Sequence, residues 1–251
     1  MYQKQKYALL KNLQDCNILK PLKECSAIIA GGAIRSVFAN EEISDYDIYF
    51  TCKKDLEKFI KIIEDEDKED DFRKVSFTES AITYKFLHSY PKVVLQVIIL
   101  PELMTIAENI IKQFDFTICM GAYDINKDEF ILHDKFLEHL SRKELYYNIA
   151  CKYPICSMYR VKKYLNKGYC ISGIEMVKLA LSINNLKMDN YKDLKKQLIG
   201  IDTMFLKDLT DVMMTSEYNN KKYEFEQFID FLDDYFINKI DDLFDYQEDD
   251  D

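Results

Sequence analysis

Two short stretches decide the fold of this chain, AGGAIRS at residues 30–36 and DYDIY at residues 45–49. The first follows a short apolar run and precedes a segment that fits a short helix. A glycine pair between a strand and a helix lets the backbone approach a ligand closely, and the start of the helix presents unpaired N–H groups to an anion. Gly31 and Gly32 are therefore candidates to seat phosphate, although most such pairs are purely structural. Arg35 would either reach the same anion or pair with a nearby acid.

The second stretch places two aspartates on one predicted strand, beginning thirteen residues after Gly32. Alternate residues of a strand face the same side, so Asp45 and Asp47 share one face while Tyr46 and Ile48 turn to the other. Mg²⁺ prefers one or two carboxylates together with phosphate oxygens. An isolated pair of this kind is more often part of a solvent-facing strand. Joined to the glycine turn, the pair predicts a site for Mg²⁺ (or Mn²⁺) beside a nucleoside triphosphate (NTP).

The segments around these stretches mix helix and strand, and the later part of the chain becomes wholly helical. Hydrophobic periodicity and β-branched content predict helices at 2–19, 33–39 and 53–64, and strands at 26–30, 45–51, 74–87 and 92–100. The last two strands should form a hairpin through a break at 88–91. A helix up to about residue 111 and a strand-turn-strand at 123–133 follow, and then helices at 154–166, 171–183, 190–213 and 222–245.

This pattern predicts an α+β fold. A small mixed sheet with helices on one face should form a first domain at 1–145, and an all-helical C-terminal domain should follow at 146–240. An acidic tail at 241–251 should be solvated.

The net charge of −10 is concentrated in two segments. Residues 241–251 carry seven acids and no base, and residues 61–71 carry seven acids and two bases, so the rest of the chain is close to neutral. The clearly basic region is 141–170, whose only acid is Glu144. Its basic residues are Arg142, Lys143, Lys152, Arg160, Lys162, Lys163 and Lys167. The overall charge therefore does not exclude RNA as a partner. Tyrosines within this region would suit base stacking, but most should be core aromatics.

Seven cysteines occur singly, without a CxxC pair, and the chain has only three histidines, so we do not expect a zinc site. The longest apolar run, 93–100, is far shorter than a membrane span. We therefore expect a protein without membrane contact in a reducing, cytoplasmic compartment.

Two further motifs join the first two in an order typical of a known family. FDFTICMGAYD at 114–124 looks like the RDFTINAxAY motif of class II tRNA CCA-adding enzymes and bacterial poly(A) polymerases. RVKKYLNKGY at 160–169 is similar to their LRAxRFxxxxGF motif, with one residue fewer before the glycine. Over residues 26–172 the chain thus resembles the head and neck of these nucleotidyltransferases of the DNA polymerase β superfamily.

The resemblance implies that an acceptor hydroxyl, with an RNA 3′ end favoured, attacks the α-phosphorus of an NTP and displaces pyrophosphate. It assigns metal binding and catalysis to Asp45 and Asp47. It assigns nucleotide binding to Gly31, Gly32, Arg35, Asp115, Arg160 and Lys163. For Asp115, an equal alternative is that it tethers the connection between the two domains. For Arg160 and Lys163, an equal alternative is that they lie on a solvated helix face.

Several positions depart from the family pattern. Ser36 stands where the family has Asp, and Phe114 and Ser157 stand where it has Arg. The position of a third carboxylate is taken by Gln96, with Glu79 on the preceding predicted strand as a weak substitute. The chain also lacks the EDxxR element that selects CTP and ATP, so we do not expect CCA addition. Two alternatives stay open: a non-catalytic nucleotide-binding or interaction module, and a transferase that acts on a protein or small-molecule hydroxyl.

Overall fold

The computed structural model describes residues 2–65, 72–87, 92–189, 191–198, 226 and 229–230. The chain divides into two compact units. The first unit comprises Met1–Lys152 and Val161–Ala180, and the second comprises Tyr153–Arg160 and Leu181–Asp251. Residues 161–180, which the sequence placed in the helical domain, thus belong with the sheet.

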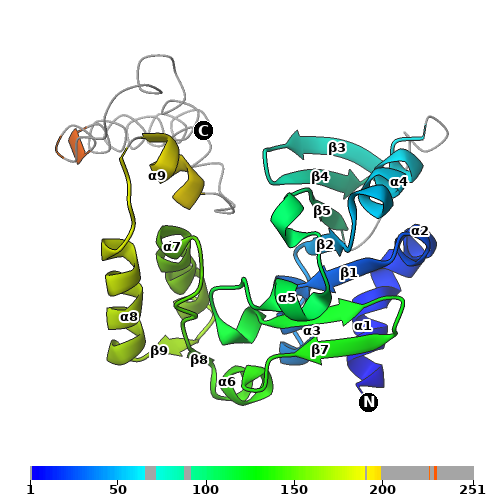
Figure 1. Cartoon of the computed structure of the whole chain (residues 1–251). Helices are drawn as coiled ribbons and strands as arrows, with labels where there is room; N and C mark the ends of the chain where they lie inside the picture. The colour runs from blue at the N-terminus through cyan, green and yellow to red at the C-terminus, as the bar shows by residue number, and fades with distance from the viewer. Residues whose placement is uncertain are drawn as a thin grey trace, which may run out of the picture. The chain divides into compact units, whose positions relative to one another are not determined.

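The first unit is built on one mixed sheet (Figure 1). Its seven strands are β1 (Ala27–Ala30), β2 (Tyr46–Phe50), β3 (Phe72–Phe77), β4 (Ala81–Phe86), β5 (Val94–Ile98), β6 (Gly121–Asp124) and β7 (Glu129–Leu132). They lie in the order β3-β4-β5-β2-β1-β6-β7. Every neighbouring pair is antiparallel except β2 and β5, which run parallel. The mixed sheet and the α+β class are as predicted.

Helices cover both faces of this sheet, and the expectation of helices on one face only was wrong. On one face, Phe50 of β2 packs against Phe59 of α4 (Lys53–Ile63), with ring centroids 5.2 Å apart. On the other face, Tyr49 belongs to a buried cluster with Ile110 and its neighbours in α5 (Ala107–Ile111). Consecutive residues of a strand point to opposite faces, so β2 contributes apolar side chains to both layers.

The remaining elements of the first unit surround the sheet. They are α1 (Gln3–Asp15), α2 (Leu19–Glu24), α3 (Gly32–Ala39), the short 3₁₀ helices η2 (Pro101–Leu103) and η3 (Thr117–Cys119), and α6 (Phe136–Arg142). The single helix expected at 2–19 is broken because Asn17 takes a left-handed conformation, φ 55°, which ends a helix.

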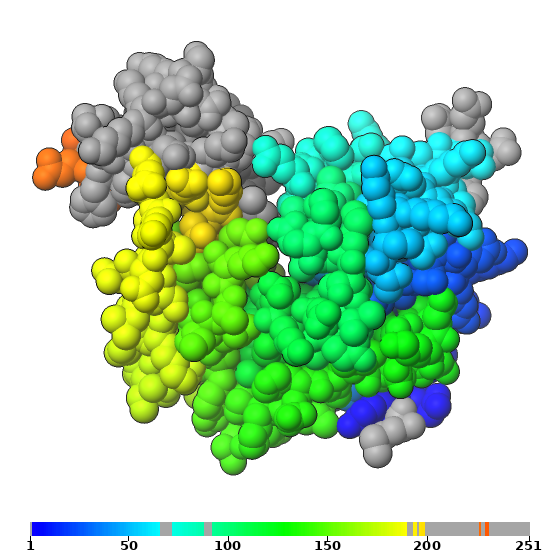
Figure 2. Space-filling model, in the orientation of Figure 1, coloured from blue at the N-terminus to red at the C-terminus, as the bar shows by residue number. Residues whose placement is uncertain are grey.

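The strand expected at 74–87 is itself a hairpin of β3 and β4, which meet at a turn. There the Thr78 hydroxyl oxygen accepts hydrogen bonds from the N–H groups of Ser80 and Ala81. Glu79 therefore lies in the turn and not on a strand. β3 is an edge strand whose residues after Phe72 are exposed, and Figure 2 shows it in cyan at the surface of this unit. The pairing of β4 with β5 confirms the predicted hairpin, whose turn at 88–91 lies outside the described residues.

The later helices are α7 (Pro154–Leu165), α8 (Gly173–Asn184) and α9 (Tyr191–Gln197). The first two agree with the predicted segments 154–166 and 171–183. A pair of two-residue parallel strands, β8 (Glu144–Leu145) and β9 (Cys170–Ile171), joins the segments on either side of α7 within the first unit. Most of the segments 190–213 and 222–245, and the acidic tail 241–251, lie outside the described residues. In the part of the chain that the structure describes, no helix combines the length and the apolar character needed to cross a membrane.

Candidate nucleotide and metal site

The first glycine of the turn is required by the fold. Gly31 has φ 76° and ψ −127°, a backbone conformation that L-residues with a side chain rarely adopt. A Cβ at this position would lie 2.7 Å from Cε1 of Phe114. The N–H of Gly31 donates to the carbonyl of Gly121 at 2.9 Å. The expectation that Gly31 offers its N–H to phosphate is therefore wrong, because strand β6 already takes that donor.

The second glycine borders open space. Gly32 is the first residue of α3, and a Cβ built on it would meet no atom within 4 Å. The first N–H groups of a helix have no acceptor within the helix. The donors of Gly32 and of Ala33, which follows it, thus stand at the positive end of α3, where an anion would be stabilised.

Asp47 lies on β2, and Asp45 lies directly before this strand. Tyr46 and Ile48 are buried, whereas Asp45 and Asp47 are partly exposed. Asp47 is the cross-strand partner of Ala30, the residue before the glycine turn. Its Oδ2 lies 3.4 Å from the point that a Cβ on Gly31 would occupy, so this carboxylate is directed toward the turn.

Asp45 ends the connection between α3 and β2, and its Oδ1 accepts a hydrogen bond from the Ser44 hydroxyl at 2.5 Å. Two partly exposed carboxylates beside an open helix N-terminus fit Mg²⁺, which takes one or two carboxylates and completes its shell with water and phosphate oxygens. Among the described residues, no group of three or more His, Cys, Asp or Glu side chains is arranged to hold a metal ion.

A row of polar residues extends from Asp47 across the sheet. Gln96 of β5 is the register partner of Asp47, and Thr83 of β4 is the register partner of Gln96. Register partners face the same side, and Gln96 and Thr83 are both partly exposed. The position at which the family pattern has a third carboxylate is thus an amide, which cannot act as a base. The weak substitute Glu79 lies in the turn between β3 and β4 and is not part of the row.

An aromatic ring stands where the family pattern has arginine. Phe114 packs against the Gly31 turn and against Tyr49, with ring centroids 6.4 Å apart. It is only partly buried and joins the cluster around α5. The ring and the carboxylate of Asp47 therefore converge on the same point beside Gly31. The sequence shows that Phe114 replaces the arginine, but no sequence pattern predicts that the ring contacts the glycine.

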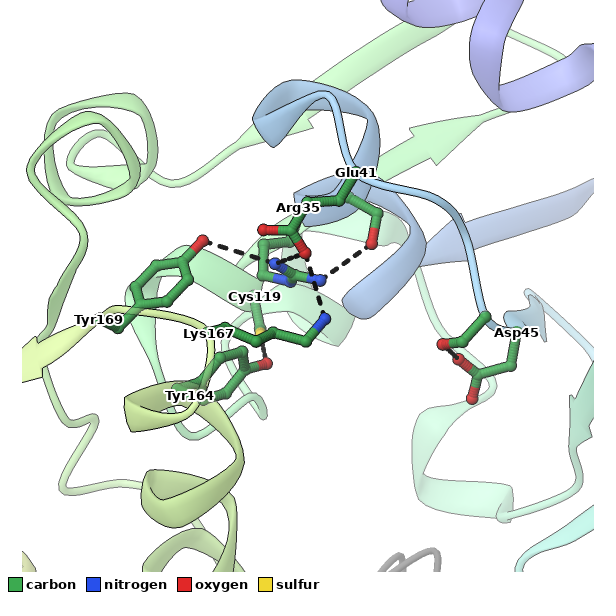
Figure 3. A network of polar contacts seen from close by, with 9 residues as sticks. Arg35, Glu41, Asp45, Cys119, Tyr164, Lys167 and Tyr169 are labelled. Carbon is green, nitrogen blue, oxygen red and sulfur yellow. Dashed lines mark hydrogen bonds and ion pairs between the residues drawn. The ribbon is translucent and has the colours of Figure 1, made fainter.

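Arg35 is turned away from solvent. It is 4% exposed, and its NH1 donates to Oε2 of Glu41 at 2.8 Å (Figure 3). Its guanidinium also bonds the Ser36 hydroxyl at 2.9 Å and lies 5.7 Å from the ring centre of Tyr164. Burial alone would lower the pKa of Arg35, but Tyr164 and the hydrogen bonds to Tyr169 and Glu41 raise it above its ordinary value. Of the two roles considered, pairing with an acid is the one observed.

Asp115 is also buried, at 2% exposure. Its Oδ1 accepts a hydrogen bond from the N–H of Phe116 at 3.0 Å, and its carbonyl accepts one from the N–H of Asn148 at 2.7 Å. The second bond joins the segment before η3 to the segment before α7, within the first unit. The part of Asp115 in nucleotide binding or in tethering stays a prediction.

The two cations expected on α7 lie in different units. Lys163 is exposed and belongs to the first unit, and Arg160 is partly exposed and belongs to the second. Their contribution to nucleotide binding stays a prediction. Among the tyrosines of the basic region, Tyr147, Tyr164 and Tyr169 are buried, as expected for core aromatics.

Comparison with known proteins identifies both a family and a fold. Residues 1–143 match the model of a family described as "Gabija anti-defense 2 family protein". The chain is 36% identical over 200 residues to "Gabija anti-defense 2" of Bacillus phage SPbetaL7. The aligned residues cover 80% of this chain and 48% of that protein. The chain therefore spans about half the length of this curated relative.

The similar solved structures include the Thermotoga maritima CCA-adding enzyme complexed with tRNA (TM-score 0.51) and a complex of a CCA-adding enzyme with CTP (TM-score 0.52). Each match has 12% identity and covers 83% of this chain and 54% of the other. At this identity the match shows the fold alone. The chain has the nucleotidyltransferase-like fold of CCA-adding enzymes.

Proposed function

This chain belongs to the Gabija anti-defense 2 family, and we propose that it is a metal-dependent nucleotidyltransferase that moves a nucleoside monophosphate from an NTP to an acceptor hydroxyl. The observation that carries the proposal is the position of Asp47. This carboxylate points toward the glycine turn at the open N-terminus of α3, and Asp45 lies directly before the same strand. A carboxylate pair beside an anion-binding helix end is the arrangement that phosphoryl transfer requires.

In this proposal Asp45 and Asp47 hold Mg²⁺ or Mn²⁺, which when bound supplies positive charge at the reacting phosphate. The N–H groups of Gly32 and Ala33 seat the phosphates of the donor, and the open space beside Gly32 admits them. The acceptor oxygen forms a bond to the α-phosphorus while the bond to the β-phosphate oxygen breaks, and pyrophosphate leaves. Gln96 lies beside Asp47 but cannot remove the acceptor proton, so the chain does not use a third carboxylate there.

The acceptor that we favour is an RNA 3′ end. The exposed Lys162 and Lys163 at the end of α7 offer cations to a nucleic acid backbone. A tRNA is bound by one of the solved proteins that share the fold. The family description further suggests that the transfer acts against Gabija defence inside a bacterial cell, and hence in the cytoplasm. A protein or small-molecule hydroxyl is the alternative acceptor.

Three observations favour a non-catalytic nucleotide-binding or interaction module as the second candidate. Phe114 replaces a cation beside the turn, Arg35 is withdrawn into an inner network, and Gln96 replaces a carboxylate. The retained pair of aspartates argues for catalysis.

A transfer assay separates these functions. The full chain is incubated with each α-labelled NTP, Mg²⁺ or Mn²⁺, a mixed RNA pool and a bacterial protein extract, and label on RNA and on protein is scored separately. Asp45→Asn and Asp47→Asn remove the charge and keep the shape, and Asp134→Asn is a matched control because Asp134 is an exposed carboxylate before α6.

Label that is lost in the two site variants but not in the control supports the proposal and identifies the acceptor. Undiminished labelling by Asp45→Asn and Asp47→Asn would refute the mechanism. NTP binding without any labelled product would favour the non-catalytic module.

A further inference from the structure

Glu41 joins two segments that are far apart in the sequence. Its Oε2 accepts a hydrogen bond from Arg35 of α3 at 2.8 Å and another from Nζ of Lys167, in the turn after α7, at 3.1 Å. Figure 3 shows the three side chains meeting, with the carboxylate between the two cations. One carboxylate thus links the start of the α3–β2 connection to a segment 126 residues later in the chain.

The Arg35 end of this cluster is rigid. The Arg35 side chain is 5% exposed, and it is held by Ser36 at 2.9 Å and by the Tyr169 hydroxyl at 3.4 Å in addition to Glu41. A buried guanidinium requires its counter-ion, because desolvating a charge without a partner is costly. Burial raises the pKa of Glu41, but its hydrogen bonds to Arg35 and Lys167 lower it by more, so this carboxylate is ionised at neutral pH. Glu41 is therefore fixed to an immobile partner.

Glu41 in turn fixes the connection that carries Asp45. Helix α3 ends at Ala39 and is capped by Asn40, which has φ 54°. The N–H groups of Asn40 and Glu41 both donate to the carbonyl of Ser36. From Glu41 the chain runs without regular structure to Asp45, and β2 begins at Tyr46. Figure 3 shows Asp45 beyond Glu41 along this segment. The sheet holds one end of the connection and the Glu41 carboxylate holds the other.

We propose that Glu41 and Lys167 are positioning residues that set the placement of Asp45 and thereby the affinity of the site for a divalent cation. The inference rests on the proposed function, since it takes Asp45 to be a metal ligand. It adds a connection between the metal site and the turn after α7, where Lys167 lies. Side chains that orient metal ligands from outside the ligand shell commonly affect affinity by about ten- to a hundredfold.

Lys167 is the residue to vary. Replacing Glu41 would leave the Arg35 charge buried without its carboxylate and would endanger the fold. The Lys167 side chain is 37% exposed, and ion pairs of that kind contribute little to stability. Lys167→Met keeps the length of the side chain and removes the charge, and Lys167→Arg restores the charge. Lys135→Met is a matched control, because it breaks an exposed ion pair with Glu138 (2.7 Å) that is remote in sequence from the α3–β2 connection.

Two measurements on the full chain test the proposal. The first is hydrogen exchange of a peptide covering residues 36–46, which contains the amides bonded to Ser36. The second is Mn²⁺ titration by electron paramagnetic resonance in the presence of an NTP. We expect Lys167→Met to speed the exchange and to weaken Mn²⁺ binding about tenfold, at the low end of such effects. Lys167→Arg should restore both, and Lys135→Met should change neither.

Unchanged exchange and unchanged Mn²⁺ affinity in Lys167→Met would overturn the inference, as would equal effects of Lys167→Met and Lys135→Met. The proposed function fails differently. It fails if Asp45→Asn binds Mn²⁺ as tightly as the natural chain, whatever the Lys167 variants do.

Discussion

The two glycines of the turn should respond oppositely to the same substitution. Gly31→Ala forces an alanine into φ 76°, ψ −127°, a conformation whose strain for a residue with a side chain is about 1–3 kcal/mol. The added methyl would also lie 2.7 and 2.9 Å from two carbons of the Phe114 ring. That ring is packed against Tyr49 and the α5 cluster, and overpacking of this kind costs about 1–3 kcal/mol more. We expect Gly31→Ala to lower the free energy of unfolding by roughly 2–6 kcal/mol.

Gly32→Ala should leave the fold intact. The added methyl meets no atom within 4 Å, and alanine is favoured over glycine within a helix, so stability should be unchanged or about 0.5–1 kcal/mol higher. NTP binding should nevertheless fall at least tenfold, because the methyl occupies the space that the phosphates are proposed to use.

Urea unfolding followed by circular dichroism, together with equilibrium binding of an NTP in Mg²⁺, measures both effects. The double variant Gly31→Ala/Phe114→Leu separates the clash from the backbone strain, because it relieves only the clash and should recover only part of the loss. A Gly31→Ala variant as stable as the natural chain would refute the structural account of the turn. A Gly32→Ala variant with undiminished NTP affinity would refute the phosphate assignment.

Three further predictions concern the surroundings of the site. Glu41→Gln should destabilise the chain by about 1–3 kcal/mol and by more than Arg35→Met in urea titrations, because only the former leaves a charge buried without its partner. Burial lowers the pKa of His139, so the imidazole takes up a proton more readily in the unfolded chain than in the folded one. The free energy of unfolding should therefore decrease as the pH falls below about 6.5. His139→Gln should remove this dependence in unfolding titrations at pH 7 and pH 5.5, and an unchanged slope would contradict it. Gln96→Glu places a third carboxylate beside Asp47 and should strengthen Mn²⁺ binding several-fold, whereas Gln96→Ala should not.

Sequence reasoning succeeded where a local rule fixes the geometry. Strand alternation was enough to predict that Asp47 turns away from the core, because the buried Tyr46 and Ile48 leave β2 a single orientation. Asp45 lies one residue before β2, so its place on the same face stays a prediction. The glycine turn was found from a local pattern too, since a glycine pair between a strand and a helix lets the backbone approach a ligand closely.

The remaining features depend on residues that are distant in sequence. The sequence left two roles open for Arg35, phosphate contact and pairing with an acid, because no local pattern reveals its partners Glu41 and Tyr169, which lie 6 and 134 residues away. The hairpin of β3 and β4 was read as one strand because its turn, at Thr78 and Ser80, is built from hydroxyl hydrogen bonds and contains neither glycine nor proline. The N–H of Gly31 donates to the carbonyl of Gly121 in β6, about ninety residues later in the chain. Hydrophobic periodicity cannot predict this hydrogen bond.

The most direct test of the account is a crystal of the full chain grown with Mn²⁺ and an NTP analogue that cannot be cleaved between its α- and β-phosphates. We predict an anomalous difference peak between the carboxylates of Asp45 and Asp47, with the phosphates of the analogue against the N–H groups of Gly32 and Ala33. A nucleotide bound elsewhere on the molecule, or one bound at the turn while Mn²⁺ lies away from both aspartates, would contradict the central claim.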